Sequence, residues 1–141
     1  MNFLDSLPYK IGTPFDQINI DLELKKKYTD NLFFYRSYRY SEIFLFERIL
    51  ESTCYLWFNK NALETVSYRF HSSLFNHFEE SINAELPEDE NLFQDPNIKE
   101  ARPYIYINKM AISLVKLNND YFSLVLSRYP SLPIIKTKKN H

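Results

Sequence analysis

The stretch CYLWFNKNALETVSYRF, residues 54–70, decides the fold class predicted for this chain. Two runs of aromatic and β-branched residues, which favour strands, flank Asn59 and Asn61. Asparagine tolerates the left-handed backbone conformation that a tight turn requires. The chain has one glycine, Gly12, so we expect asparagine to replace glycine at the turns. The stretch therefore predicts an antiparallel β-hairpin.

Further strands are predicted from aromatic and β-branched content or from two-residue alternation of apolar and polar side chains. A second hairpin is predicted over ISLVKLNNDYFSLVLS, residues 112–127, with Asn118, Asn119 and Asp120 at its turn. INIDLEL, residues 18–24, predicts a half-buried strand, and residues 32–40 and 43–48 predict two strands with a turn near residues 40–42. YIYI, residues 104–107, predicts the strand that opens the last part of the sheet.

HSSLFNHFEESINAEL, residues 71–86, predicts the main helix. Its apolar residues recur every four positions and so share one face of a helix: Leu74, Phe78 and Ile82. Ser72 or Ser73 is available as an N-cap, and Pro87 ends the pattern. We therefore predict an amphipathic helix over residues 72–86, followed by a long loop over residues 87–103.

These elements predict an α+β fold: an antiparallel meander sheet of about six to eight strands with the helix packed on it. We expect one domain over residues 1–141, with frayed ends at residues 1–10 and 130–141. The alternative is an all-α bundle, because apolar residues between positions 107 and 124 also follow alternating spacings of three and four. Three poor helix formers at residues 118–120 interrupt that stripe and favour the sheet.

The composition limits the classes of function. A formal net charge of -1 excludes a strong overall attraction to nucleic acid or anionic membranes. No apolar run approaches the roughly 18 residues of a membrane span. The N-terminus has Asp5 where a signal peptide requires basic residues, and a lone cysteine, Cys54, cannot form an internal disulfide. We therefore expect a cytoplasmic protein without a membrane partner.

No catalytic or cofactor-binding set is recognisable, and we predict a non-enzymatic protein without cofactor or metal ion. A single glycine excludes the glycine-rich loops that bind phosphate. Cys54 lies in an apolar run, where free cysteine behaves as a small buried residue. His77 and Glu80, three residues apart on the predicted helix, have the spacing of half a metal site or an acid–base pair. A surface histidine beside a solvated glutamate accounts for the same pair more simply.

The most asymmetric feature is an acidic run without a basic residue between positions 79 and 95. Acidic side chains near a helix C-terminus oppose the helix dipole, so local stability does not explain them. The alternative is that these residues form an ordinary solvent-exposed helix end and loop without a binding role. A negative surface attracts a basic protein and accelerates its association. The run thus predicts a partner-binding surface of Glu79, Glu80, Glu85, Glu88, Asp89, Glu90 and Asp95.

A second candidate surface is YRSYRY, residues 35–40. In a strand, Tyr38 and Tyr40 share a face with Arg36, while Tyr35 and Arg39 lie on the other. Tyrosine and arginine dominate protein-interface hot spots, and aromatic side chains also stack on single-stranded bases. Nearby acidic residues and the absence of glycine–aromatic motifs disfavour nucleic acid, which we do not expect as a partner.

In its overall organisation the chain resembles the small immunity proteins of bacterial toxin–immunity systems, of the contact-dependent inhibition type. The features of this likeness are the segment IGTPFDQI, the hairpin YLWFNKNALETVSYRF, an amphipathic helix, an acidic loop and a final hairpin. The resemblance implies a cytosolic protein that binds one cognate toxin, often a nuclease, and occludes its active site. Our leading hypothesis is such an inhibitor with a basic partner, and the alternative is a nucleic-acid-binding accessory protein that uses residues 35–40.

Overall fold

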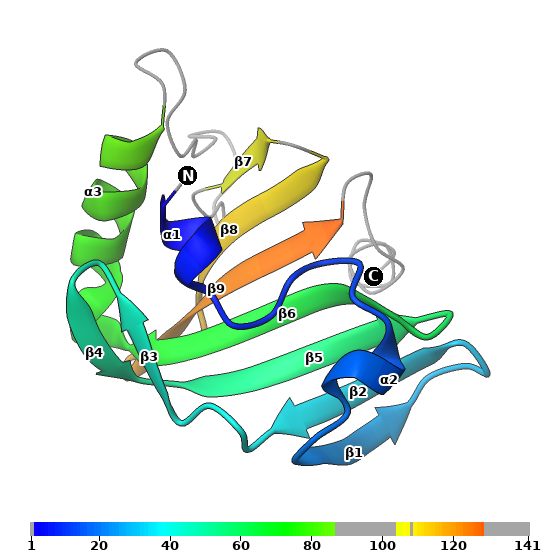
Figure 1. Ribbon diagram of the computed structural model, residues 1–141. Helices are drawn as coiled ribbons and strands as arrows, with labels where there is room; N and C mark the ends of the chain where they lie inside the picture. The colour runs from blue at the N-terminus through cyan, green and yellow to red at the C-terminus, as the bar shows by residue number, and fades with distance from the viewer. Residues whose placement is uncertain (1, 87–103, 108, 129–141) are drawn as a thin grey trace.

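The computed structural model describes residues 2–86, 104–107 and 109–128. Within these ranges, seven antiparallel strands form one sheet in the order β1-β2-β5-β6-β9-β8-β7, and β3 and β4 form a separate hairpin (Figure 1). The elements are α1 (Asn2–Ser6), α2 (Phe15–Ile18), β1 (Leu22–Lys27), β2 (Leu32–Ser37), β3 (Glu42–Leu45), β4 (Arg48–Glu51), β5 (Thr53–Asn59), β6 (Ala62–His71), the 3₁₀ turn η1 (Ser72–Leu74), α3 (Phe75–Glu85), β7 (Tyr104–Ile107), β8 (Met110–Lys116) and β9 (Tyr121–Arg128). The α+β prediction is confirmed. The all-α alternative is wrong, because the stretch with helical spacing forms parts of β7, β8 and β9.

The hairpin predicted from residues 54–70 is formed by β5 and β6. Asn59 pairs with Ala62, so Lys60 and Asn61 form the turn. Their φ angles are 53° and 64°, in the left-handed region that a two-residue turn of type I′ requires. Asparagine thus takes the place of glycine at one of the two turn positions, and lysine occupies the other.

Replacing Asn61 with alanine is expected to destabilise the protein by about 1 kcal/mol, because alanine tolerates a left-handed backbone less well than asparagine. The free energy of unfolding in urea, followed by circular dichroism, measures the effect. Asn119→Ala is the matched control, since Asn119 lies in a turn without a positive φ and should change stability by less than about 0.5 kcal/mol. Equal losses in the two variants would contradict this role for Asn61.

The second predicted hairpin, formed by β8 and β9, turns in a different way. The side-chain oxygen of Asn118 accepts hydrogen bonds from the backbone N–H groups of Asp120 and Tyr121, at 2.8 and 2.9 Å. None of residues 118–120 has a positive φ. Here asparagine closes the turn with its side chain and not through a left-handed backbone.

The strand predicted over residues 18–24 is wrong in its first half. Asp21 has a φ of 57°, and β1 begins only after it. A left-handed residue breaks the extended chain, so the two-residue alternation does not place the apolar side chains on one buried face. Ile20 and Leu24 are accordingly 53% and 51% exposed.

Residues 32–40 and 43–48 contain strands, but these strands do not pair with each other. β2 ends at Ser37 and pairs with β1 and β5. β3 pairs with β4, and their turn consists of Phe46 and Glu47, with φ angles of 52° and 64°. The turn predicted near residues 40–42 corresponds to the connection of residues 38–41 between β2 and β3, but it does not join these strands into a hairpin. Phenylalanine and glutamate are not turn formers of this type, which is why the sequence pattern missed the hairpin.

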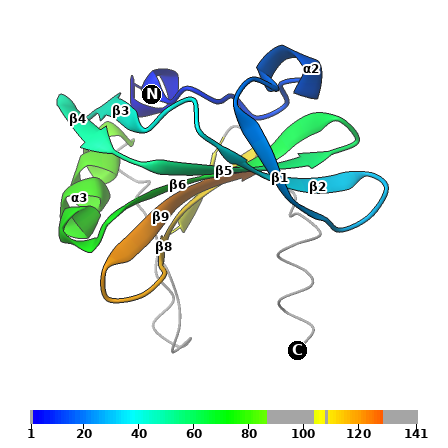
Figure 2. The ribbon, with the colours of Figure 1, turned by 90° about the horizontal axis from the view of Figure 1, so that it is seen from below.

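One face of the main sheet is apolar and holds the core. Alternate residues of its central strands are buried there: Cys54, Leu56, Phe58, Val66, Tyr68, Phe70, Ile112, Leu114, Phe122, Leu124 and Leu126. α1, α2 and the β3–β4 hairpin lie on one side of the sheet (Figure 2). α3 packs against β6 and β9, because Phe78 contacts the rings of Phe70 and Phe122 at centroid distances of 4.6 and 5.1 Å.

The helix predicted over residues 72–86 is present as η1 followed by α3. Phe78 and Ile82 are fully buried, as the four-residue spacing predicted. The predicted serine N-cap is wrong, because the Nδ1 atom of His71 accepts the hydrogen bond from the backbone N–H of Ser73 at 3.1 Å. The loop predicted over residues 87–103 and the frayed end at residues 130–141 lie outside the described residues.

Residues 2–10, which belong to the end predicted to be frayed, pack against the sheet instead. Phe3, Leu7 and Tyr9 are 1%, 2% and 4% exposed. The hydroxyl of Tyr68 accepts a hydrogen bond from the backbone N–H of Tyr9 at 3.2 Å, and the Tyr9 hydroxyl lies 2.5 Å from that of Ser37. Burial raises the pKa of Tyr9 and Tyr68, so both hydroxyls remain protonated at neutral pH. The segment is therefore part of the core.

Candidate protein-binding surface

α3 carries three of the seven acidic residues predicted to bind a partner. Glu80 is exposed and Glu79 is half-buried, and neither forms an ion pair with a described residue. Glu85 has a structural role: its carboxylate accepts a hydrogen bond from the backbone N–H of Phe3 at 2.9 Å and so links α1 to α3. The other four lie outside the described residues: Glu88, Asp89, Glu90 and Asp95.

The β3–β4 hairpin extends this negative surface, which the sequence did not predict. The ring of Phe46, at the hairpin turn, packs edge-on against His77 and Phe78 at centroid distances of 6.0 and 5.1 Å. The hairpin turn therefore lies against α3 (Figure 1). The hairpin adds three exposed glutamates: Glu42, Glu47 and Glu51.

We define the acidic end as Glu42, Glu47, Glu51, Glu79 and Glu80. Glu42 and Glu51 occupy directly opposite positions in the hairpin register, where like charges are destabilising. Arg48 is the single lysine or arginine in the hairpin and α3. None of the five glutamates forms an ion pair with a described residue. Folding does not explain this arrangement, and the carboxylates are available to a partner.

Four lysines lie at the opposite end of the sheet, where Glu23 and Asp30 form ion pairs with two of them, Lys25 and Lys27. Lys25, Lys26 and Lys27 lie on the edge strand β1, where lysines also discourage pairing with another chain. The β5–β6 turn adds Lys60, whose backbone N–H donates to the carbonyl oxygen of Asn31 at 2.9 Å. We define these four lysines as the basic end. Figures 1 and 2 both place the β1–β2 and β5–β6 turns far from α3, so these lysines lie away from the acidic end.

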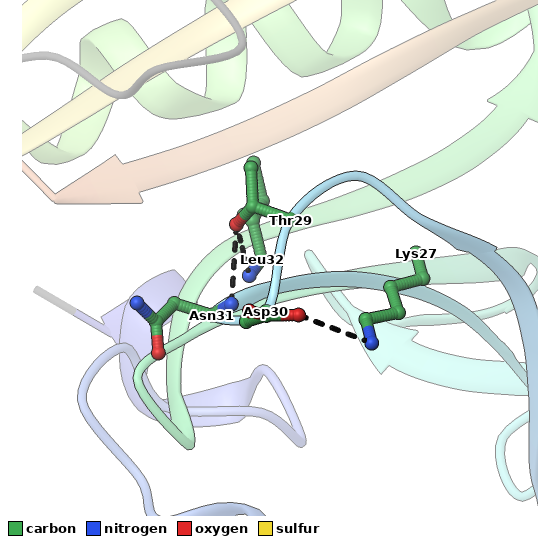
Figure 3. A network of polar contacts seen from close by, with 5 residues as sticks. All are labelled: Lys27, Thr29, Asp30, Asn31 and Leu32. Atoms are coloured by element: carbon green, nitrogen blue, oxygen red, sulfur yellow. Dashed lines mark hydrogen bonds and ion pairs between the residues drawn. The ribbon is translucent and has the colours of Figure 1, made fainter.

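The β1–β2 turn at the basic end is held by its own polar contacts (Figure 3). The hydroxyl oxygen of Thr29 accepts hydrogen bonds from the backbone N–H groups of Asn31 and Leu32, at 3.1 and 3.0 Å. The ammonium nitrogen of Lys27 lies 3.3 Å from a carboxylate oxygen of Asp30. The threonine side chain thus fixes the turn, as it does in an ST turn.

The predicted Tyr/Arg surface is not continuous, because β2 ends at Ser37. Tyr35 faces the core, with its ring 5.6 Å from that of Phe58. Arg36 lies on the other face, and its guanidinium is 4.5 Å from the centre of the Tyr38 ring. The predicted contact between Arg36 and Tyr38 is therefore present, but Tyr35 is not available to a partner on that face.

Arg39 and Tyr40 lie beyond the strand. The Tyr40 ring packs edge-on against Tyr9 at 5.3 Å, and its hydroxyl accepts a hydrogen bond from Nε of Arg39 at 3.2 Å. Tyr40 therefore packs on the core side and does not share a face with Arg36. That part of the prediction is wrong, because the strand alternation stops before Tyr40.

Aromatic and arginine side chains of β2, β5, β6 and β9 join Arg36 on the sheet face away from the core. Phe34 stacks on Trp57 at a centroid distance of 4.5 Å. The guanidinium of Arg69 lies 5.5 Å from the Tyr55 ring and 5.0 Å from the Tyr121 ring. These contacts join β2, β5, β6 and β9, which only the sheet pairing brings together. No local sequence pattern could therefore have revealed them.

The described residues do not assemble a catalytic set. Cys54 is fully buried, and burial raises the pKa of its thiol to about 12, so it remains protonated and a poor nucleophile. The Nε2 atom of His77 is buried without a hydrogen-bond partner, so it forms no hydrogen bond with Glu80. In the described ranges, no group of three or more His, Cys, Asp or Glu residues could hold a metal ion.

A cleft of about 310 Å³ lies where α3 begins, beside the β8–β9 turn. Its lining includes Lys116, Asn118 and Tyr121, but no carboxylate, imidazole or thiol. The hydroxyls of Ser72 and Tyr121 and the Lys116 ammonium therefore have no carboxylate or imidazole among the lining residues to activate them. The acidic end is therefore the stronger candidate for a functional site.

Comparison with known proteins gives no match: no protein family, curated protein or solved structure is significantly similar to this chain. Among the helices that the structure describes, none has the length and apolar character needed to cross a membrane. Function is therefore inferred from the surfaces of the molecule.

Proposed function

We propose that this chain is a non-enzymatic, cytoplasmic inhibitor of the immunity-protein type. Its acidic end binds a basic toxin, such as a nuclease, and occludes the active site. One observation carries the proposal: the β3–β4 hairpin and α3, which are separate in sequence, lie side by side and together carry five glutamates without ion-pair partners among the described residues. Packing places the two elements together, and Glu42 and Glu51 lie directly opposite each other in the hairpin although like charges there are destabilising.

Electrostatics explain why this arrangement suits an inhibitor. Complementary charge steers diffusional encounter and raises association rates to as much as about 10⁸–10⁹ M⁻¹s⁻¹. At the basic end, Glu23 and Asp30 offset two of the four lysines, so the unpaired carboxylates of the acidic end are the features that attract a basic partner. An inhibitor must occupy its target before the target acts, and fast association meets that requirement.

Binding of single-stranded nucleic acid by residues 35–40 has less support. A platform for bases needs free ring faces in a positively charged groove. Tyr35 and Tyr40 pack on the core side, and Arg36 lies over one face of Tyr38. The hydroxyl of Tyr38 also donates a hydrogen bond to a carboxylate oxygen of Glu23 at 2.8 Å. Protein binding is therefore the preferred function.

Co-expression with the product of the gene immediately upstream tests the proposal. We expect this product to arrest bacterial growth when it is expressed alone, and growth to recover when the present chain is expressed with it. The two proteins should also elute as one complex in size-exclusion chromatography. An upstream product that is not toxic and does not bind, or growth arrest that persists in the presence of the chain, would overturn the proposal.

A further inference from the structure

The outer face of the β3–β4 hairpin carries two large apolar side chains that the fold leaves in solvent. Phe44 and Ile49 are 62% and 71% exposed, the highest values among the exposed large apolar residues in the described ranges. They occupy opposite positions in the hairpin register and so form one patch. The inner face carries Ile43, Leu45 and Leu50, which are buried. The hairpin thus joins the core through its inner face and through Phe46 at its turn.

Charged residues surround this patch. Glu42 and Glu51 face each other at the open end of the hairpin, and Glu47 lies at its turn. A partner that covers the patch must also remove water from these carboxylates, which is unfavourable unless cations replace the water. The matching surface therefore combines an apolar floor with lysine or arginine side chains at its rim.

We propose that the β3–β4 hairpin anchors the partner, with Phe44 and Ile49 inserted into an apolar cleft that has a basic rim. An enzyme that acts on a polyanion has such a cleft, because its cations hold the phosphates of the substrate. This inference rests on the proposed function and names the contact that completes it. The acidic end attracts the partner during association, and Phe44 and Ile49 hold the partner in the complex.

Two competing roles for the exposed pair make different predictions. If the cross-strand contact between Phe44 and Ile49 serves only the hairpin, its loss lowers stability and leaves binding unchanged. If a second copy of this chain covers the patch through its basic end, the chain self-associates at low salt. Both roles can be separated from the proposal by experiment.

Two synthetic peptides serve as defined probes of the full chain. One is an amphipathic helical peptide of leucine and lysine, and the other has serine in place of every leucine at the same charge. Amide chemical shifts in nuclear magnetic resonance titrations report both the affinity and the place of binding. The test variant is Phe44→Ser/Ile49→Thr. The matched control is Leu24→Ser/Ile20→Thr, which changes a similarly exposed apolar pair elsewhere.

We expect the leucine–lysine peptide to bind at least about tenfold more tightly than the serine–lysine peptide, with the largest shifts in residues 42–51. The test variant should bind the leucine–lysine peptide with about tenfold lower affinity than the wild-type chain, and the serine–lysine peptide with less than about twofold lower affinity. The control should leave both affinities unchanged. Ile49→Thr alone, which keeps a β-branched residue in the strand, provides a milder variant if the double substitution perturbs the hairpin.

Equal affinity for the two peptides, or leucine–lysine shifts that fall outside residues 42–51, would overturn the anchor. Self-association of the wild-type chain in sedimentation that the test variant abolishes would overturn it too. Because the probes are peptides, these outcomes are independent of the co-expression test. If the chain neutralises the upstream product but binds the two peptides with equal affinity, the proposed inhibitor function holds and the hairpin is not the anchor.

Discussion

The Phe78→Ala variant is expected to lose about 3–5 kcal/mol of the free energy of unfolding. Phe78 is fully buried, and its ring contacts those of Phe46, Phe70 and Phe122. Its truncation leaves a cavity where α3, the β3–β4 hairpin and the main sheet meet. The total free energy of unfolding of a native domain is only about 5–15 kcal/mol, so the variant loses a large share of its stability. Urea unfolding followed by circular dichroism measures the change.

Phe44→Ala is the matched control for this substitution. It removes the same atoms from a position that is 62% exposed, so the expected loss is below about 1 kcal/mol. A loss of less than about 1.5 kcal/mol for Phe78→Ala would contradict the packing of α3 on β6 and β9.

The second large effect concerns the rate of association with the upstream product. The Glu42→Lys/Glu80→Lys variant is expected to bind at least about tenfold more slowly at low salt, because two attractive charges become repulsive. Stopped-flow fluorescence measures the association rate constant. Both residues are exposed and without ion pairs to described residues, so the fold should tolerate the change.

Asp16→Lys/Asp30→Lys is the matched control for the charge reversal. It makes the same change in net charge at exposed positions in α2 and in the β1–β2 turn, outside the acidic end. The association rate constant should then change by less than about threefold. Equal slowing in the two double variants would mean that net charge matters and the acidic end does not.

The strands of the sheet could be predicted where the sequence contains a residue that favours a turn between them. Asn61 and Asn118 mark the two hairpins that the sequence identifies, one through a left-handed backbone and the other through its side chain. The β3–β4 hairpin could not be predicted in this way. Phe46 has a positive φ while its ring packs against α3, and that tertiary contact offsets the cost of the conformation. Such a contact leaves no local pattern.

The candidate site could be predicted only in part. Glu79 and Glu80 were identified because they are adjacent in a one-signed run. Glu42 and Glu51 were not, because only the contact of Phe46 with α3 brings their hairpin beside that helix. One signal was available in the sequence: residues 42–51 place apolar side chains on both faces of the hairpin, and an isolated two-stranded ribbon cannot bury both.

The salt dependence of the association rate tests most directly whether the acidic end docks a basic protein. For the wild-type chain and the upstream product, the rate constant should fall by about tenfold or more as the Debye length shrinks from about 30 Å at 0.01 M salt to about 8 Å at 0.15 M. The Glu42→Lys/Glu80→Lys variant should lose most of this dependence. A wild-type rate that does not change with salt, or an unchanged dependence in the variant, would contradict the account.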